Sequence, residues 1–390
     1  MTAFPTDPLR CDDPAAARDT TFAAIVARRL SRRALFRAGL VVAAAAAVNP
    51  VDALPGARAS HAHVPRQAAG RGRLGFAAIQ PSTADRILVP DGYRATVLLG
   101  WGDALFPDVP PFDIANQTPE LQARRFGYNC DFLAYLPLPE HAGAPDHGLL
   151  WVNHEYTDGA MMFPGYDAAN PTPAQVDIEL AAHGASIVEV RRTREGWAYV
   201  RDSRYNRRVT GTTPVAIAGP AAGHPLLQTR EDPTGTRVLG MLNNCGGGVT
   251  PWGTVLTCEE NFNQYFANVN ALADADLRRA AHRRYGLPGG ASERKWERFY
   301  RRFDVAQEPN EPFRFGWVVE VDPYDPTSQP VKRTALGRIK HEAATCVVAP
   351  SGQVVVYSGD DERFECVYKF VSRGRWDPQR REANRDLLDD

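Results

Sequence analysis

Short apolar runs bounded by turn residues recur along most of the chain and predict β-strands. Runs of about four to eight apolar or alternating residues between Gly, Pro, Asn or Asp are typical of strands rather than helices. The 31 Pro and 32 Gly of the chain supply many of these boundaries. Strands are predicted at residues 93–99, 149–152, 185–192, 197–201 and 315–321, and a hairpin is predicted around residues 350–352.

The spacing of these runs indicates an all-β architecture. No regular alternation of strands and helices is present, as a parallel α/β fold would require. Residues 261–302 are charged, and helical spacing over residues 271–284 predicts a helical insertion on the β scaffold, with its charges on a solvated face. No sequence repeat of fixed length is visible, so the pattern alone does not establish a propeller.

Composition narrows the function classes. The formal net charge is −1, and no basic excess points to nucleic acid as a partner. Six cysteines are present, and Cys11 lies in a segment that we expect to be removed. The odd number that remains disfavours a fully paired disulfide framework and leaves room for one thiolate metal ligand.

The first 59 residues predict an export signal of the Tat type. Twin arginines, Arg32 and Arg33, precede a short apolar run over residues 38–48, and a small-x-small site follows at residues 57–59. The apolar run is too short to cross a bilayer as a helix. We therefore expect the Tat machinery as a partner, no stable membrane anchor, a periplasmic or secreted location, and a mature domain over residues 60–390.

Residues 243–260 carry the strongest chemical signal. Cys245 is followed by three glycines, a Pro-Trp-Gly turn and a short strand that ends on Glu259 and Glu260. A thiolate and carboxylates near a glycine-rich backbone suit a transition metal with calcium better than structural zinc. The alternative is a buried structural cysteine beside a glycine-rich turn, with two solvated glutamates at the strand end.

Residues 243–254 and 257–261 resemble the signature of the PhoX-type alkaline phosphatases of the DUF839 family. That signature is close to Asn-x-Cys-x-Gly-Gly-x-Thr-Pro-Trp-Gly-Thr, followed by Thr-Cys-Glu-Glu-Asn. Further similar blocks are the long segment before the twin arginines and residues 151–156, 336–344 and 359–363. Together the similar blocks run from about residue 10 to about residue 375.

The resemblance implies a six-bladed β-propeller with a metal cluster at its central axis. It also implies a monomeric, exported enzyme that hydrolyses phosphate monoesters with Ca²⁺ and Fe³⁺. The family's later Arg-Pro-Glu-type element has no counterpart in the chain. We therefore expect the chain to lack the C-terminal part of the family pattern and its propeller to be incomplete.

The resemblance assigns roles to individual residues. Cys245 is expected to bridge iron, and Glu260, Glu342 and Asp361 to bind iron or calcium. Asn153 and Glu155, which follow a buried apolar strand, and Glu259 are further candidate ligands. As a strand, residues 338–342 would place Arg338, Lys340 and Glu342 on one face, where the two cations could hold an oxyanion.

Two other functions stay open from the sequence. One is a calcium-stabilised, truncated propeller that binds without turnover. The other is a calcium-dependent lactonase-like propeller, which would have no use for Cys245. The Cys245→Ala substitution separates the hypotheses, because only the phosphatase should lose iron and activity together.

Overall fold

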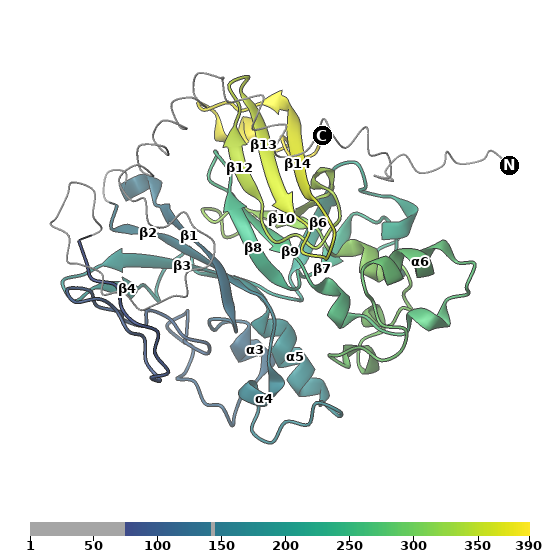
Figure 1. The fold of residues 1–390 in the computed structure, drawn as a ribbon, viewed down its shortest axis with the longest axis horizontal. Coiled ribbons are helices and arrows are strands. Elements are labelled where there is room, and N and C mark those ends of the chain that lie inside the picture. Colours follow the sequence, from purple (N-terminus) through teal and green to yellow (C-terminus); the bar gives the residue numbers. More distant parts are fainter. Residues whose placement is uncertain (1–74, 142–144) are drawn as a thin grey trace, which may run out of the picture. The chain divides into compact units, whose positions relative to one another are not determined.

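The computed structural model describes residues 75–141 and 145–390. The chain divides into two compact units, of which the first ends at Tyr93 and the second comprises Arg94–Asp390. Residues 75–93 contain no helix or strand, and all the elements named below belong to the second unit (Figure 1). The predicted export signal lies outside the described residues.

The first sheet contains five strands. They are β1 (Cys130–Pro137), β2 (His147–His154), β3 (Gly184–Arg192), β4 (Trp197–Tyr199) and β5 (Arg207–Val209). The order is β1-β2-β3-β4, β5 also pairs with β3, and all pairs are antiparallel. The predicted strands at residues 149–152, 185–192 and 197–201 lie in this sheet and are confirmed, with β4 ending at Tyr199.

The second sheet contains six strands. They are β6 (Pro214–Ala218), β7 (Arg237–Leu239), β8 (Asn244–Val249), β9 (Val255–Glu259), β10 (Val318–Val321) and β11 (Val331–Arg333). Their order is β7-β6-β11-β10-β9-β8, with only the β6–β11 pair parallel. All five residues of β9 are buried, which places this strand inside the protein.

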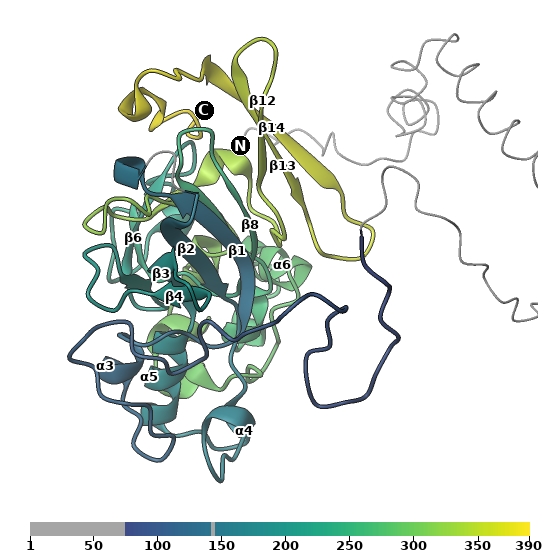
Figure 2. The ribbon, with the colours of Figure 1, turned by 90° about the vertical axis from the view of Figure 1, so that its left-hand side faces the viewer.

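The third sheet is an antiparallel meander. It consists of β12 (Thr345–Val348), β13 (Gln353–Gly359) and β14 (Val367–Arg375), which Figure 2 shows side by side. The turn between β12 and β13 contains Gly352 at φ 84°, a left-handed conformation that glycine adopts without steric cost. The predicted hairpin around residues 350–352 is confirmed.

The helices are few and short. The α-helices are α3 (Pro119–Gln122), α4 (Gly159–Met162), α5 (Pro173–Ala182) and α6 (Leu277–Arg284). The 3₁₀ helices are Pro139–His141, Pro225–Leu227, Phe262–Tyr265, Val269–Ala271, Trp296–Arg298, Arg301–Phe303, Glu311–Arg314, Thr334–Leu336 and Arg381–Asn384. No helix in the described residues has the length and apolar character to cross a membrane.

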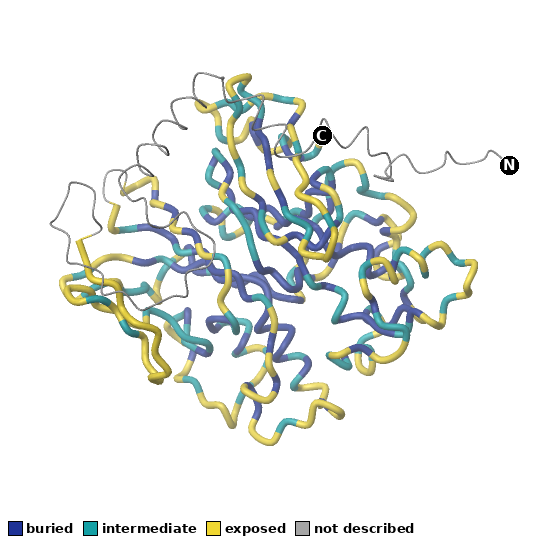
Figure 3. Tube along the Cα trace, in the orientation of Figure 1, coloured by how far each residue is buried: buried dark blue, intermediate teal, exposed yellow. Residues whose placement is uncertain are grey.

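Two hydrophobic clusters hold the three sheets together. The larger one joins residues of the first sheet, such as Trp151, to Val255 and other residues of the second. The other joins Leu256 of β9 to Val354 and Val356 of β13. Because side chains of a strand alternate between its faces, Val255 and Leu256 enter different clusters, and β9 is covered on both sides. Buried residues, dark blue in Figure 3, follow these strands.

The sequence predictions fail at three places. Residues 93–99 form no strand, and Val97 is 83% exposed, because no strand of the described residues pairs with this segment. Within residues 271–284 the only α-helix is Leu277–Arg284, and residue 271 ends a separate 3₁₀ helix. Residues 338–342 form only an isolated bridge between His341 and Asp360, because Gly337 at φ 87° turns the chain just before them.

Candidate metal centre

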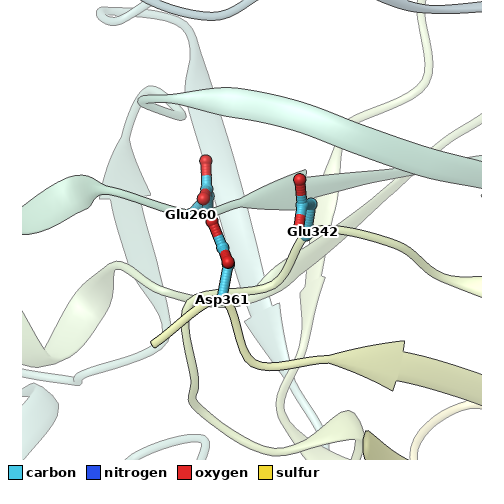
Figure 4. Close-up of side chains that lie close together, drawn as sticks. All are labelled: Glu260, Glu342 and Asp361. Atoms are coloured by element: carbon cyan, nitrogen blue, oxygen red, sulfur yellow. The ribbon is translucent and has the colours of Figure 1, made fainter. Parts of the chain in front are cut away.

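Three carboxylates meet at the ends of strands from different parts of the chain. One ligand atom of each of Glu260, Glu342 and Asp361 lies within 4.8 Å of the other two, and Figure 4 shows the three side chains together. Glu260 directly follows β9, Glu342 precedes β12 and Asp361 follows β13. The structure therefore brings together three of the predicted carboxylate ligands.

Backbone hydrogen bonds hold the three segments in this arrangement. The amide of His341 donates to Glu259 O at 3.2 Å, which ties the segment to the end of β9. The amide of Glu342 donates to Gly359 O at 3.2 Å, and that of Asp361 donates to Lys340 O at 3.0 Å. Residues 340–342 thus lie between the ends of β9 and β13, and their position fixes the separation of the carboxylates.

His341 anchors this middle segment from inside. Its ring is buried and bonds to Gly337 O at 2.9 Å and Ser358 Oγ at 2.7 Å. Burial lowers the pKa of His341 to about 4, so the ring is neutral at physiological pH. Because both ring nitrogens have protein partners, we assign His341 a structural role.

The three glycines after Cys245 let β8 lie directly against residues 342–344. A Cβ built on Gly246 would overlap Glu342 O, and one on Gly248 would overlap Ala344 O. The amide of Ala344 also donates to Gly247 O at 3.3 Å. The glycines therefore make room for the backbone that carries Glu342, and not directly for an ion.

Substitution of Gly246 by Ala is expected to lower the free energy of unfolding by about 1–3 kcal/mol and to weaken metal binding. The added methyl group must push residues 342–344 away from β8, which moves Glu342. Gly290→Ala is the matched control, because a Cβ at Gly290 has no neighbour within 4 Å. Chemical denaturation and calcium titration of both variants test this, and equal behaviour of the two would contradict it.

Cys245 lies beside the carboxylates. The residue is 4% exposed, and its Sγ is 3.5 Å from His341 O. Burial, and after it the charge of Glu260, raise the pKa of the Cys245 thiol above its usual value. Without a cation the thiol therefore stays protonated, and a bound metal ion would favour the thiolate.

Asn153 positions Cys245 through the backbone. Its Nδ2 donates to Cys245 O at 2.7 Å and to Gly246 O at 3.0 Å. Its Oδ1 accepts hydrogen bonds from Trp151 Nε1 and Thr257 Oγ1, each at 2.8 Å. Every polar atom of this side chain has a protein partner, so the structure gives Asn153 a supporting contact rather than a place among the three carboxylates.

Glu155 and Asp131 extend the acidic cluster. Burial, and then the charge of Asp131, raise the pKa of Glu155 to about 7. Burial and the charges of Asp361 and Asp131 raise the pKa of Glu342. Sequence reasoning missed Asp131. The pairing of Cys130 with His154 in the register of β1 and β2 brings Asp131 near Glu155, and only knowledge of this register could have identified it.

The electrostatics of the cluster fit bound cations. Burial raises the pKa of Glu260 to about 8, and a hydrogen bond with Asp361 and the charge of Glu155 contribute. No Lys or Arg in residues 75–141 and 145–390 forms an ion pair with Glu260, Glu342 or Asp361. Several carboxylates without a basic partner are a donor set for a hard cation such as calcium, and the adjacent thiol adds a soft donor.

The structure does not bring Glu259 to this cluster. Its oxygens accept hydrogen bonds from Lys332 Nζ at 2.8 and 2.9 Å. They also accept backbone amide hydrogen bonds from Leu242, Gly316 and Trp317. Both Glu259 and Lys332 have fully buried side chains. The physical reason is that successive side chains of a strand point to opposite faces, so Glu259 at the end of β9 is directed away from the side that Glu260 faces.

The two predicted oxyanion-binding cations have protein partners. Arg338 donates to Phe315 O at 2.7 Å and to Pro312 O at 2.8 Å, and its guanidinium lies 4.4 Å from the ring centroid of Tyr285. Burial lowers the pKa of Arg338 to about 10. Lys340 Nζ donates to Glu362 Oε2 at 2.7 Å. Their contact with a substrate stays a prediction.

Comparison with known proteins identifies a family for the chain. A family model described as alkaline phosphatase PhoX matches residues 74–390. A solved structure of Pseudomonas fluorescens PhoX in complex with vanadate, a transition state analogue, is similar at 45% identity and a TM-score of 0.75. The similarity covers 81% of the present chain and 53% of the solved chain, about half of its length. A search of curated protein sequences gave no match. The predicted all-β, propeller-type fold class is confirmed.

Proposed function

Because the chain belongs to the alkaline phosphatase PhoX family, we propose that it hydrolyses phosphate monoesters at the centre formed by Glu260, Glu342 and Asp361. The observation that carries this proposal is the convergence of these carboxylates with Cys245 nearby. Such a donor set serves a phosphatase, whereas a lactonase-like site has no use for the thiol. The proposed cations are Ca²⁺ and Fe³⁺.

The side chains divide into holding and supporting groups. Glu260, Glu342 and Asp361 would hold the cations, and Cys245 would supply the thiolate. When bound, the cations would stabilise the negative charge on the phosphoryl oxygens as it develops in the transition state. Asn153 fixes the backbone at Cys245 through two hydrogen bonds. This division assigns Asn153 the task of keeping the thiol beside Glu260.

Glu155 and Asp131 add negative charge at the rim of the centre. Their mutual repulsion, together with the burial of Glu155, makes the carboxylate of Glu155 ready to accept a proton near neutral pH. We propose Glu155 as a further ligand or as a proton acceptor for the attacking water. Asp131 supports either role by raising the pKa of Glu155.

Export and assembly complete the proposal. The Tat-type signal over residues 1–59 would direct the folded chain to the periplasm or the exterior, and the enzyme would act as a monomer without a stable membrane anchor. Tat export moves folded proteins, so the cations could be loaded before export.

Metal analysis combined with an assay on a generic aryl phosphate tests the function. We expect calcium and iron in the purified protein, turnover at alkaline pH, and loss of turnover after chelation. Because the pKa of Glu260 is raised to about 8, calcium must displace its proton below that pH. The apparent calcium affinity should therefore rise from about pH 6 to about pH 9. Stoichiometric calcium binding without turnover would instead support a binding propeller.

A further inference from the structure

The loop that follows β13 carries both Asp361 and, three residues later, a solvent-exposed aromatic side chain. Residues 360–366, here called the 360–366 loop, include Asp361 and connect β13 to β14. Phe364 in this loop has a relative exposure of 102%, the highest among the exposed large hydrophobic residues of the described chain. A fully exposed phenylalanine is unusual, because the ring gains free energy by leaving water.

The backbone at Phe364 is also unusual. Its φ is 68°, in the left-handed region, which bulky side chains rarely adopt. A residue in such a conformation persists only where its surroundings impose it, and such residues concentrate at functional sites. The conformation of Phe364 therefore has a local structural cause.

Two ion pairs flank Phe364 in the loop. Lys340 Nζ lies 2.7 Å from Glu362 Oε2, and Arg284 NH1 lies 2.8 Å from Glu365 Oε1. Between these pairs, the amide of Glu365 donates to Glu362 O at 3.1 Å and closes a turn. Phe364 thus lies in a turn that is tied to the protein on both sides.

The base of the loop is tied to the metal centre as well. The amide of Asp360 donates to Cys366 O at 3.1 Å, and that of Asp361 donates to Lys340 O at 3.0 Å. Asp361 and Glu342 are the exposed members of the acidic cluster, whereas Glu260 is buried. A ligand must approach the cluster from solvent, on the side that Asp361 and Glu342 face. Phe364, three residues after Asp361, is also directed into solvent.

We propose that Phe364 packs against the organic group of the phosphate ester, so that the site prefers aryl and other large apolar phosphate monoesters over small polar ones. This inference rests on the proposed phosphatase function. The phosphoryl group needs the cluster, but the remainder of the ester would extend towards solvent, where the 360–366 loop offers an exposed ring. Because hydrogen bonds already hold the backbone of this loop, the entropic cost of ordering the backbone when the ester binds is small.

Substitution of Phe364 by Ala, in the full chain with its metals bound, tests the proposal. An aromatic contact of the usual strength predicts a loss of about 3- to 10-fold in kcat/KM for phenyl phosphate, mostly through KM. The kcat/KM for glycerol phosphate should change by less than about twofold. Phe364→Trp, which keeps an aromatic ring, should retain the preference for phenyl phosphate. Val97→Ala, which also removes an exposed apolar side chain, is the control.

Each outcome decides the proposal. An equal loss for both esters, or no loss for phenyl phosphate, overturns it. If the wild-type protein hydrolyses neither ester, the proposed function fails. The contact of Phe364 is then tested by itself, by measuring the binding of phenylphosphonate and methylphosphonate by calorimetry. A preference for phenylphosphonate that Phe364→Ala removes supports the contact. Equal binding of the two phosphonates, or binding of neither, contradicts it.

Discussion

Replacing Glu260 with Gln is expected to lower phosphate monoester hydrolysis on the order of 10³-fold or more and to reduce metal content. Glu260 is the buried member of the three converging carboxylates, and it interacts with both Asp361 and Cys245. Gln keeps the shape of the side chain but removes its charge and one of its strong acceptor positions. Metal analysis, calcium titration and the aryl phosphate assay measure the effect.

The same substitution should have a different effect on stability. Because burial and neighbouring acids raise the pKa of Glu260 to about 8, ionised Glu260 destabilises the metal-free folded state above that pH. At about pH 9 in a chelator, Glu260→Gln should therefore be at least as stable as the wild type. This result would show that the substitution removes a metal ligand without disturbing the fold.

Glu231→Gln is the control for this pair of measurements, because Glu231 is exposed. The control should retain activity and metal content. A Glu260→Gln variant with native turnover and native metal content would remove Glu260 from the centre. A variant that is inactive and also much less stable in the chelator would point to a structural role instead.

Replacing Lys332 with Met is expected to lower the free energy of unfolding by about 3–5 kcal/mol. The side chains of Lys332 and Glu259 are both 0% exposed, and Lys332 Nζ also donates to Arg314 O at 2.8 Å. Without Lys332, the carboxylate of Glu259 would be buried with no cation to balance it. Urea denaturation at neutral pH, with metal present and absent, measures the loss.

The double variant Glu259→Gln/Lys332→Met provides the comparison. It removes both charges, so it should be more stable than Lys332→Met alone. A loss below about 1 kcal/mol for the single variant, or a double variant that is less stable than the single one, would mean that the pair contributes little. The activity of the double variant then shows whether Glu259 affects the neighbouring Glu260.

The candidate ligands could be predicted from sequence because they occupy strand ends within recognisable motifs. Glu260, Glu342 and Asp361 each follow or precede a strand, and the structure brings them together. The motif could not distinguish Glu259 from Glu260. Every residue of β9 is buried, so the sequence contains no polar–apolar alternation that would show which glutamate faces which side.

Other parts of the site depend on contacts between distant segments. Asp131 approaches Glu155 only through the register of β1 with β2, which the pattern along one strand does not contain. The partners of Arg338 are carbonyl groups and aromatic rings of other segments, among them Tyr285. Gly337 at φ 87° prevents the strand that would have aligned Arg338 with Lys340. These contacts depend on which distant segments pack together, and the local pattern of apolar and polar residues does not show that.

The origin of the three carboxylates in separate segments has a consequence for biosynthesis. A growing chain that has been synthesised only as far as β9 carries Glu260 but neither Glu342 nor Asp361. The complete donor set exists only after synthesis has passed residue 361 and β13 has joined the third sheet. High-affinity metal uptake should therefore report that this part of the chain has folded. In a cell, occupancy of the centre would distinguish molecules that have folded through β13 from unfinished ones.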